Sequence, residues 1–216
     1  MKGLFLKDLY LIKSNIGSVF ILVALSIWFA VVMENPIFAL FYITLISVTT
    51  GIGTLSRDER ENSLNFFLTL PVTVKSYVKE KFAFCISVGS AALLFLTAVI
   101  TILKFGFGFN YVMSEILTTV LFAFLFLFIA TSLMLAFQFK FGVERMRTIG
   151  LTICGLIAAA AYILSKFTDD STIMGFANKL LGLNKAMLAA AVFAISLVVL
   201  LCSVKYSIKT LSAKFS

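Results

Sequence analysis

The sequence predicts an all-α integral membrane protein with six transmembrane helices. Hydrophobic residues occupy 61% of its 216 positions and charged residues 13%, and the mean hydropathy is +1.09. Soluble domains are about half apolar and about a quarter charged. The apolar runs also continue for about 20 residues, which is the length of a helix that crosses a ~30 Å hydrocarbon layer. Barrel strands would alternate instead, so the helical class is favoured.

The first fifteen residues predict an amphipathic helix that lies at the membrane surface. Lys2, Lys7 and Lys13 interrupt its leucines and isoleucines, and we expect these three lysines to anchor it there. The apolar run that follows is too long for a signal peptide and ends without a small-residue cleavage pattern. We therefore expect this segment to be retained.

Six apolar runs follow, and together with this helix they predict one transmembrane domain over residues 1–216. The predicted spans are residues 16–33, 37–55, 82–103, 116–137, 149–164 and 186–204. Pro36 is placed to begin the second span. In the connection before the sixth span, Ile173, Phe176 and Leu180 recur at helical spacing, which predicts a short external helix or, alternatively, an ordinary polar loop.

Basic residues are unevenly divided between the two sides of the membrane, and this division predicts the orientation. Of the 18 lysines and arginines, all but Lys104, Lys166, Lys179 and Lys185 lie on the side that carries both termini and the connection between spans two and three. That side is predicted to be cytoplasmic. Because the net charge of +8 follows from this topology, it does not indicate a nucleic-acid partner.

The sequence predicts no catalytic, metal or cofactor site in this chain. The predicted spans contain no Asp, Glu, Lys or Arg, and charges that persist at the bilayer centre usually carry protons, ions or substrate. There is no histidine, and Cys85, Cys154 and Cys202 lie in separate apolar runs. The phosphate-binding loop of an ATPase is also missing. An intramembrane enzyme is therefore disfavoured.

The connection at residues 56–81 is the one long polar insertion of the sequence. Leu64, Phe67 and Leu68 recur there at helical spacing, Pro71 stops the helix, and Thr73 is placed to cap a second one. A short helix that exposes Phe and Leu to water needs cover. We expect it to dock a cytoplasmic partner, the alternative being that it folds back on the bilayer surface.

The residues of this insertion resemble the ABC-2 class of ABC transporter permeases. The resemblance rests on Arg57-Asp58-Glu59, on Ser63-Leu64, on Leu68-x-Leu70-Pro71-Val72-Thr73 and on Lys81 at the start of the third span. Leu6-Lys7-Asp8-Leu9 also resembles the amphipathic first helix of that family. Val74 departs from the pattern, because a basic residue is common there and Lys75 follows instead.

The resemblance implies the membrane subunit of an ABC exporter, not an enzyme in itself, in a bacterial cell membrane. A separate ABC ATPase subunit would bind ATP and Mg, and a second permease copy or a related permease would complete a dimer that is surrounded by membrane lipid. The helix before Pro71 would be the coupling helix that contacts the ATPase. The contact residues implied are Arg57, Asp58, Glu59, Arg60, Glu61, Leu64, Phe67, Leu70 and Pro71.

The compact chain is similar to bacterial peptide exporter permeases such as the phenol-soluble-modulin exporters. The expected substrate is therefore amphipathic or hydrophobic, a peptide before a lipid-like compound or a drug. A different class of function is also open. A non-transporting scaffold, immunity or sensory protein would use the same helix to dock an unrelated cytoplasmic partner.

Overall fold

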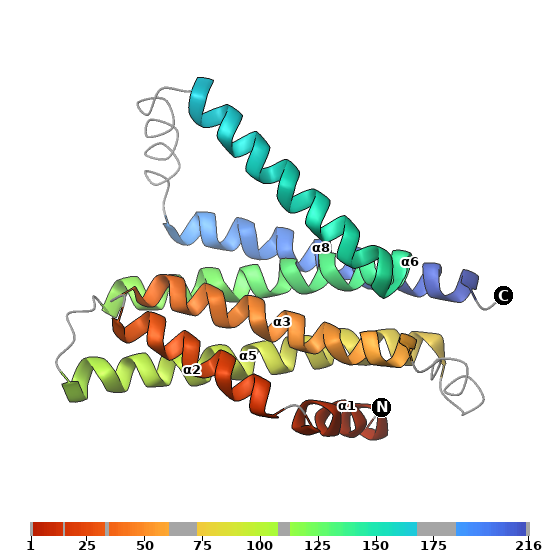
Figure 1. Cartoon of the computed structure of the whole chain (residues 1–216), viewed down its shortest axis with the longest axis horizontal. Coiled ribbons are helices and arrows are strands. Elements are labelled where there is room, and N and C mark those ends of the chain that lie inside the picture. The colour runs from red at the N-terminus through yellow and green to blue at the C-terminus, as the bar shows by residue number, and fades with distance from the viewer. Residues whose placement is uncertain are drawn as a thin grey trace.

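The computed structural model describes residues 2–14, 16–32, 35–60, 73–107, 113–167 and 185–214, and the regular structure in these ranges is entirely helical (Figure 1). The helices are α1 (Lys2–Ser14), α2 (Ile16–Val32), α3 (Pro36–Arg60), α5 (Val74–Phe107), α6 (Met113–Phe167) and α8 (Lys185–Lys214). The all-α prediction is confirmed.

Four helices within the described ranges are long and apolar enough to cross a membrane: Pro36–Arg60, Val74–Gly106, Ile116–Val143 and Val192–Ala213. A pair of helices, Gly3–Ser14 and Val19–Val32, is bent by 72° and passes the same test when taken together. The structure therefore supports four to five spans. The predicted span at 149–164 lies in the second part of α6, where the structure describes the backbone only.

Two helices begin at capping residues, and for one of them the sequence predicted the cap. The backbone N–H of Phe38 donates to Asn35 Oδ1 at 3.0 Å, and α3 begins at Pro36. Thr73 Oγ1 accepts from the backbone N–H of Ser76 at 3.3 Å, and α5 begins at the next residue. A side-chain oxygen at the N-cap satisfies a backbone donor that has no partner within the helix. The predicted Thr73 cap is confirmed.

The helices α3 and α5 extend beyond the apolar runs that define the predicted spans. At about 1.5 Å per residue, the 34 residues of α5 are about 51 Å long, well beyond the ~30 Å of a hydrocarbon layer. The first two turns of α5 and the last turn of α3 therefore carry polar residues on continuous helix. Residues 61–72, which include most of the predicted coupling helix, and residues 173–181 of the predicted external helix lie outside the described residues.

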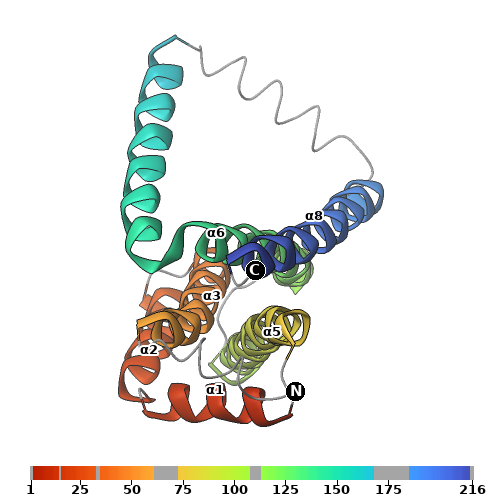
Figure 2. The ribbon, with the colours of Figure 1, turned by 90° about the vertical axis from the view of Figure 1, so that its right-hand side faces the viewer.

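The core of the bundle is formed around α3, which packs against α2, α5 and α6, while α8 packs on α6 and α5 (Figures 1 and 2). One buried cluster, here called the apolar end, contains Ala30, Ala39, Leu40, Ile43, Leu93, Leu96, Ile100, Ile116 and Ala123. A second, at what we call the charged end, contains Leu4, Leu55, Tyr77, Val78, Phe82, Cys85, Leu135, Phe139 and Leu211. Because Leu4 of α1 and Leu211 of α8 both belong to that cluster, both helices contribute to the core at the end of the bundle where α3 terminates.

The long helix α6 is broken once, at Gly142, whose φ of 77° and ψ of 173° are not helical. A positive φ is readily adopted only by glycine. The break separates the predicted fourth and fifth spans, and the part after it turns away from the bundle (Figure 2). The carboxylate of Glu59 at the end of α3 accepts a hydrogen bond from the Val143 backbone N–H at 2.9 Å, which caps the helix that follows the break.

Candidate functional site

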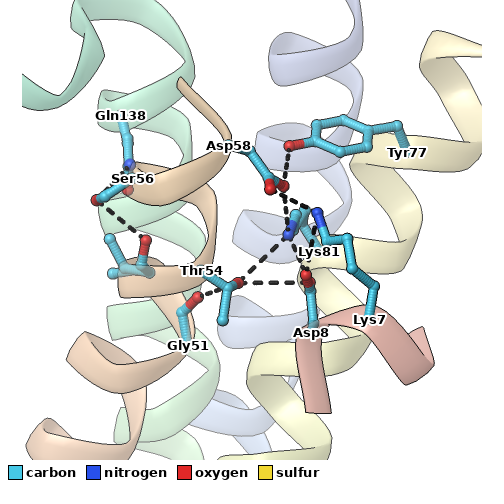
Figure 3. A network of polar contacts seen from close by, with 10 residues as sticks. Lys7, Asp8, Gly51, Thr54, Ser56, Asp58, Tyr77, Lys81 and Gln138 are labelled. Atoms are coloured by element: carbon cyan, nitrogen blue, oxygen red, sulfur yellow. Dashed lines mark hydrogen bonds and ion pairs between the residues drawn. The ribbon is translucent and has the colours of Figure 1, made fainter. Parts of the chain in front are cut away.

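Polar side chains from three helices meet at the charged end, in a part of the molecule that is otherwise apolar (Figure 3). Each helix supplies two of them, and they are adjacent in sequence on α1 and four residues apart on α3 and α5. Residues four apart lie on one face of a helix, so α3 and α5 each present their two side chains on a single face. The six residues are Lys7 and Asp8, Thr54 and Asp58, and Tyr77 and Lys81, and we call them the charged junction.

Lys81 is the centre of the charged junction. Its Nζ lies 2.5 Å from Asp8 Oδ2 and 2.9 Å from Asp58 Oδ2. Lys7 Nζ lies 2.5 Å from Asp58 Oδ1 and 3.5 Å from Asp8 Oδ1. Two ammonium groups and two carboxylates therefore balance one another. The side chains of Lys81 and Asp8 are 1% and 0% exposed, whereas that of Lys7 is 28% exposed.

Neutral hydroxyl groups complete the contacts of these charges. Tyr77 Oη donates to Asp58 Oδ2 at 2.9 Å, and Lys81 Nζ donates to Thr54 Oγ1 at 3.3 Å. Thr54 Oγ1 lies 3.4 Å from Asp8 Oδ2 and 2.8 Å from the Gly51 carbonyl oxygen. A buried charge is tolerated when an opposite charge and further hydrogen bonds replace its water. The charged junction therefore fixes the relative positions of α1, α3 and α5.

Glu80 lies beside the charged junction without joining it. The residue is 4% exposed, and neither of its carboxylate oxygens has a hydrogen-bond partner among the described residues. Within the described ranges no three His, Cys, Asp or Glu side chains are grouped so that they could hold a metal ion. The junction is thus an arrangement for holding helices together, with no metal-ligand set in the described part of the chain.

Four of the charged residues expected to contact a partner are described, and the structure separates them. Asp58 is buried in the junction, and Glu59 accepts the hydrogen bond from Val143. Arg57 Nη1 donates to Ser14 Oγ at 3.3 Å, while Arg60 is exposed at the end of α3. The other expected partner-contact residues, Glu61, Leu64, Phe67, Leu70 and Pro71, lie outside the described residues.

The three lysines expected to anchor α1 are also placed differently from one another. Lys7 points into the charged junction and pairs with Asp58, Lys13 is exposed, and the side chain of Lys2 is not described. The outward face of α1 carries Leu6, Leu9 and Tyr10, which are exposed. The helix thus turns Lys7 inward and these three apolar side chains outward, whereas a helix in water exposes its charges and buries its apolar face.

The amino-acid pattern of the chain matches one known family over nearly its whole length. Residues 3–212 match the family described as "ABC-2 family transporter protein". No curated protein and no solved structure gives a significant match.

Proposed function

This chain belongs to the ABC-2 family of transporter proteins and is a membrane component without an ATPase domain, and on that premise we propose that it is the permease subunit of an exporter. A separate ATP-binding subunit would supply the energy, binding ATP and Mg itself. The charged end would face the cytoplasm of a bacterial cell, as the distribution of basic residues predicts.

The observation that carries the proposal is that two residues of the charged junction, one before and one after residues 61–72, are paired with each other. Asp58 lies two residues before the end of α3, and Lys81 lies in the second turn of α5. Their ion pair, at 2.9 Å, joins the two helices that flank the segment. A force applied to that segment would therefore move α3 and α5 together rather than spreading them apart.

Within this proposal the charged residues of the insertion divide into two groups. Asp58 and Glu59 act as positioning residues, because their carboxylates are engaged with Lys81 and with the Val143 backbone N–H. Arg60 is exposed and, with Glu61, Leu64, Phe67, Leu70 and Pro71, would contact the ATPase. Apolar anchors surrounded by charge are typical of such docking surfaces.

The substrate we propose is amphipathic or hydrophobic, a peptide in the first instance. The predicted spans are uncharged, and a neutral pathway favours compounds that carry their own apolar surface. We propose further that a second permease copy or a related permease encloses this pathway. Exposed apolar side chains on α8, such as Phe193, Ile195 and Leu201, would face lipid or that second permease.

The proposal is tested by copurification and by ATP hydrolysis in proteoliposomes. A soluble ATPase with a phosphate-binding loop should copurify with the wild-type chain, and its hydrolysis should rise when substrate is present. Phe67→Asp should abolish this stimulation, since a charged group would replace an apolar anchor at the contact. Lys79→Ala, on the exposed side of α5, is the matched control and should retain it.

Two results would count against the exporter. If Phe67→Asp couples as well as the wild type does, the helix before Pro71 is not the ATPase contact. If the purified chain retains an unrelated cytoplasmic protein and no ATPase, the scaffold or sensory function is favoured instead.

A further inference from the structure

A hollow of about 180 Å³ lies between α1, α2 and α3, and Thr54 is one of its lining residues. Leu11 and Ile12 of α1 and Val19 and Leu22 of α2 give it apolar walls, and Arg57 of α3 is the one charged lining residue among those described. It occupies the angle of the 72° bend between the first two helices. The hollow therefore combines an apolar interior with one positive charge.

Most N–H donors of the Arg57 guanidinium group have no acceptor among the described residues. Among the described residues it makes one hydrogen bond, to Ser14 Oγ at 3.3 Å, and no ion pair. The two carboxylates that follow it in sequence are turned elsewhere, Asp58 to Lys7 and Lys81 and Glu59 to Val143. A guanidinium group carries five N–H donors in a planar fork that matches a phosphate. Within the described part of the chain, Arg57 therefore keeps N–H donors that could bind an anion from outside.

The surroundings of the hollow indicate where that anion comes from. Exposed apolar side chains flank it, Leu9 and Tyr10 on α1 and Ile16 and Phe20 on α2. Such surfaces face hydrocarbon in a membrane protein, and tyrosine is enriched at the level of the lipid headgroups. Thr54 lines the hollow and also belongs to the charged junction, so the hollow adjoins the level where apolar helix surface gives way to charge.

We propose that this hollow binds one anionic phospholipid. The lipid phosphate is held by Arg57, and the start of one acyl chain lies along Leu11, Val19 and Leu22. The phosphate supplies the opposite charge that Arg57 lacks within the described part of the chain, and charge-assisted contacts of this kind are stronger than neutral ones. Since Thr54 lines the hollow and also contacts Asp8 and Lys81, a bound lipid braces α1 against the charged junction.

Lipid retention is measured by native mass spectrometry of the purified chain after exchange into detergent with defined lipid. With an equimolar mixture of phosphatidylglycerol and phosphatidylcholine, the wild type should retain one phosphatidylglycerol. Arg57→Gln should lower this retention about tenfold, which corresponds to about 1.4 kcal/mol. Arg60→Gln removes the same charge from an exposed position on the same helix end and should leave retention unchanged.

A second variant tests the apolar part of the site. A Cβ placed on Gly53 would meet no heavy atom within 4 Å, so Gly53→Leu should fill the hollow without displacing a helix. It should reduce retention of phosphatidylglycerol while the circular dichroism stays that of the wild type and the melting temperature does not fall, because leucine favours the helix more than glycine does. Soluble glycerol 3-phosphate should not compete, because it lacks the acyl chain.

The proposal is overturned if Arg57→Gln and Arg60→Gln retain the lipid equally, or if phosphatidylcholine is retained as well as phosphatidylglycerol. Competition by glycerol 3-phosphate would overturn it in favour of a free-phosphate site. None of these measurements involves an ATPase, so they stand apart from the tests of the exporter.

Discussion

The two ends of the helical bundle are held together by different forces. At the apolar end, Leu40, Leu93 and Ile100 pack with small alanines, and no charged residue belongs to that buried cluster in the part of the chain described. At the charged end, a comparable apolar cluster is joined by the ion pairs of Lys7 and Lys81. The residues of insertion 56–81 that the structure describes adjoin this second end.

This difference has a mechanical meaning. Dispersion contacts are individually weak and non-directional, so an apolar interface accepts small changes of side-chain position. An ion pair buried among apolar groups has a narrow optimum, because each charge loses its water and has only its partner to replace it. The charged end is therefore the more rigidly specified of the two, and it adjoins the segment that we propose receives force from the ATPase.

The largest expected effect comes from removing the central charge. Lys81→Met leaves the carboxylates of Asp8 and Asp58 buried near one another without that ammonium group, and should destabilise the chain by about 3–5 kcal/mol. Thermal unfolding in detergent, followed by circular dichroism, measures the change. Lys79→Met, on the exposed face of the same helix, is the matched control and should unfold like the wild type. Equal melting temperatures for both variants would mean that the ion pairs of Lys81 do not stabilise the charged end.

A smaller effect is expected where α3 and α5 touch just inside the charged junction. A Cβ on Gly51 would lie 2.6 Å from Cys85 Sγ and 3.3 Å from Cys85 Cα, so Gly51→Ala should cost about 1–3 kcal/mol. Gly53→Ala, two residues further along the same helix, meets nothing within 4 Å and should stabilise the helix by up to about 1 kcal/mol. The same unfolding assay compares the two.

A rescue experiment identifies the cause of the Gly51 effect. Adding Cys85→Ala to Gly51→Ala removes the sulfur atom that crowds the new methyl group, and part of the lost stability should return. If the double variant is no more stable than Gly51→Ala, the close approach of α3 and α5 does not set the cost.

The smallest effect is expected at the apolar end. Ile100 is fully buried there, and Ile100→Val removes one methylene group, which costs about 0.5–1.5 kcal/mol in a packed core. The melting temperature should fall accordingly, by less than in Lys81→Met. A loss as large as that of Lys81→Met would show that the apolar end is specified as tightly as the charged one.

Much of the local structure could be predicted from the sequence. The start of α3 at Pro36 and the cap of α5 at Thr73 depend on residues within one turn, and the positions of the helices follow from runs of apolar residues. The separate fourth and fifth spans appear as one helix broken at Gly142. Sequence reasoning placed the boundary between these spans without identifying the residue that makes it, because the conformation of one glycine leaves no periodic signal.

The charged junction was not predicted as a unit. Asp8 and Lys81 are 73 residues apart, and each one alone looks like an ordinary polar residue at the edge of an apolar run. The one available signal was that Asp58 and Lys81 stand close to opposite ends of the same insertion, where a pair would join its two flanking helices. Glu59 likewise looks like a surface residue in the sequence. In the structure, the break at Gly142 places the Val143 backbone N–H where it donates to the Glu59 carboxylate.

The sequence by itself determined that this chain is helical, membrane-embedded and a member of a transporter family, because composition, apolar run length and short motifs are properties of neighbouring residues. Only the tertiary structure decided that α1 turns Asp8 inward and Leu9 outward, and that Asp58 pairs inside the bundle. The direction of a side chain in a helix is periodic and therefore predictable, but whether that direction leads to solvent, lipid or an opposite charge depends on which helices pack beside it.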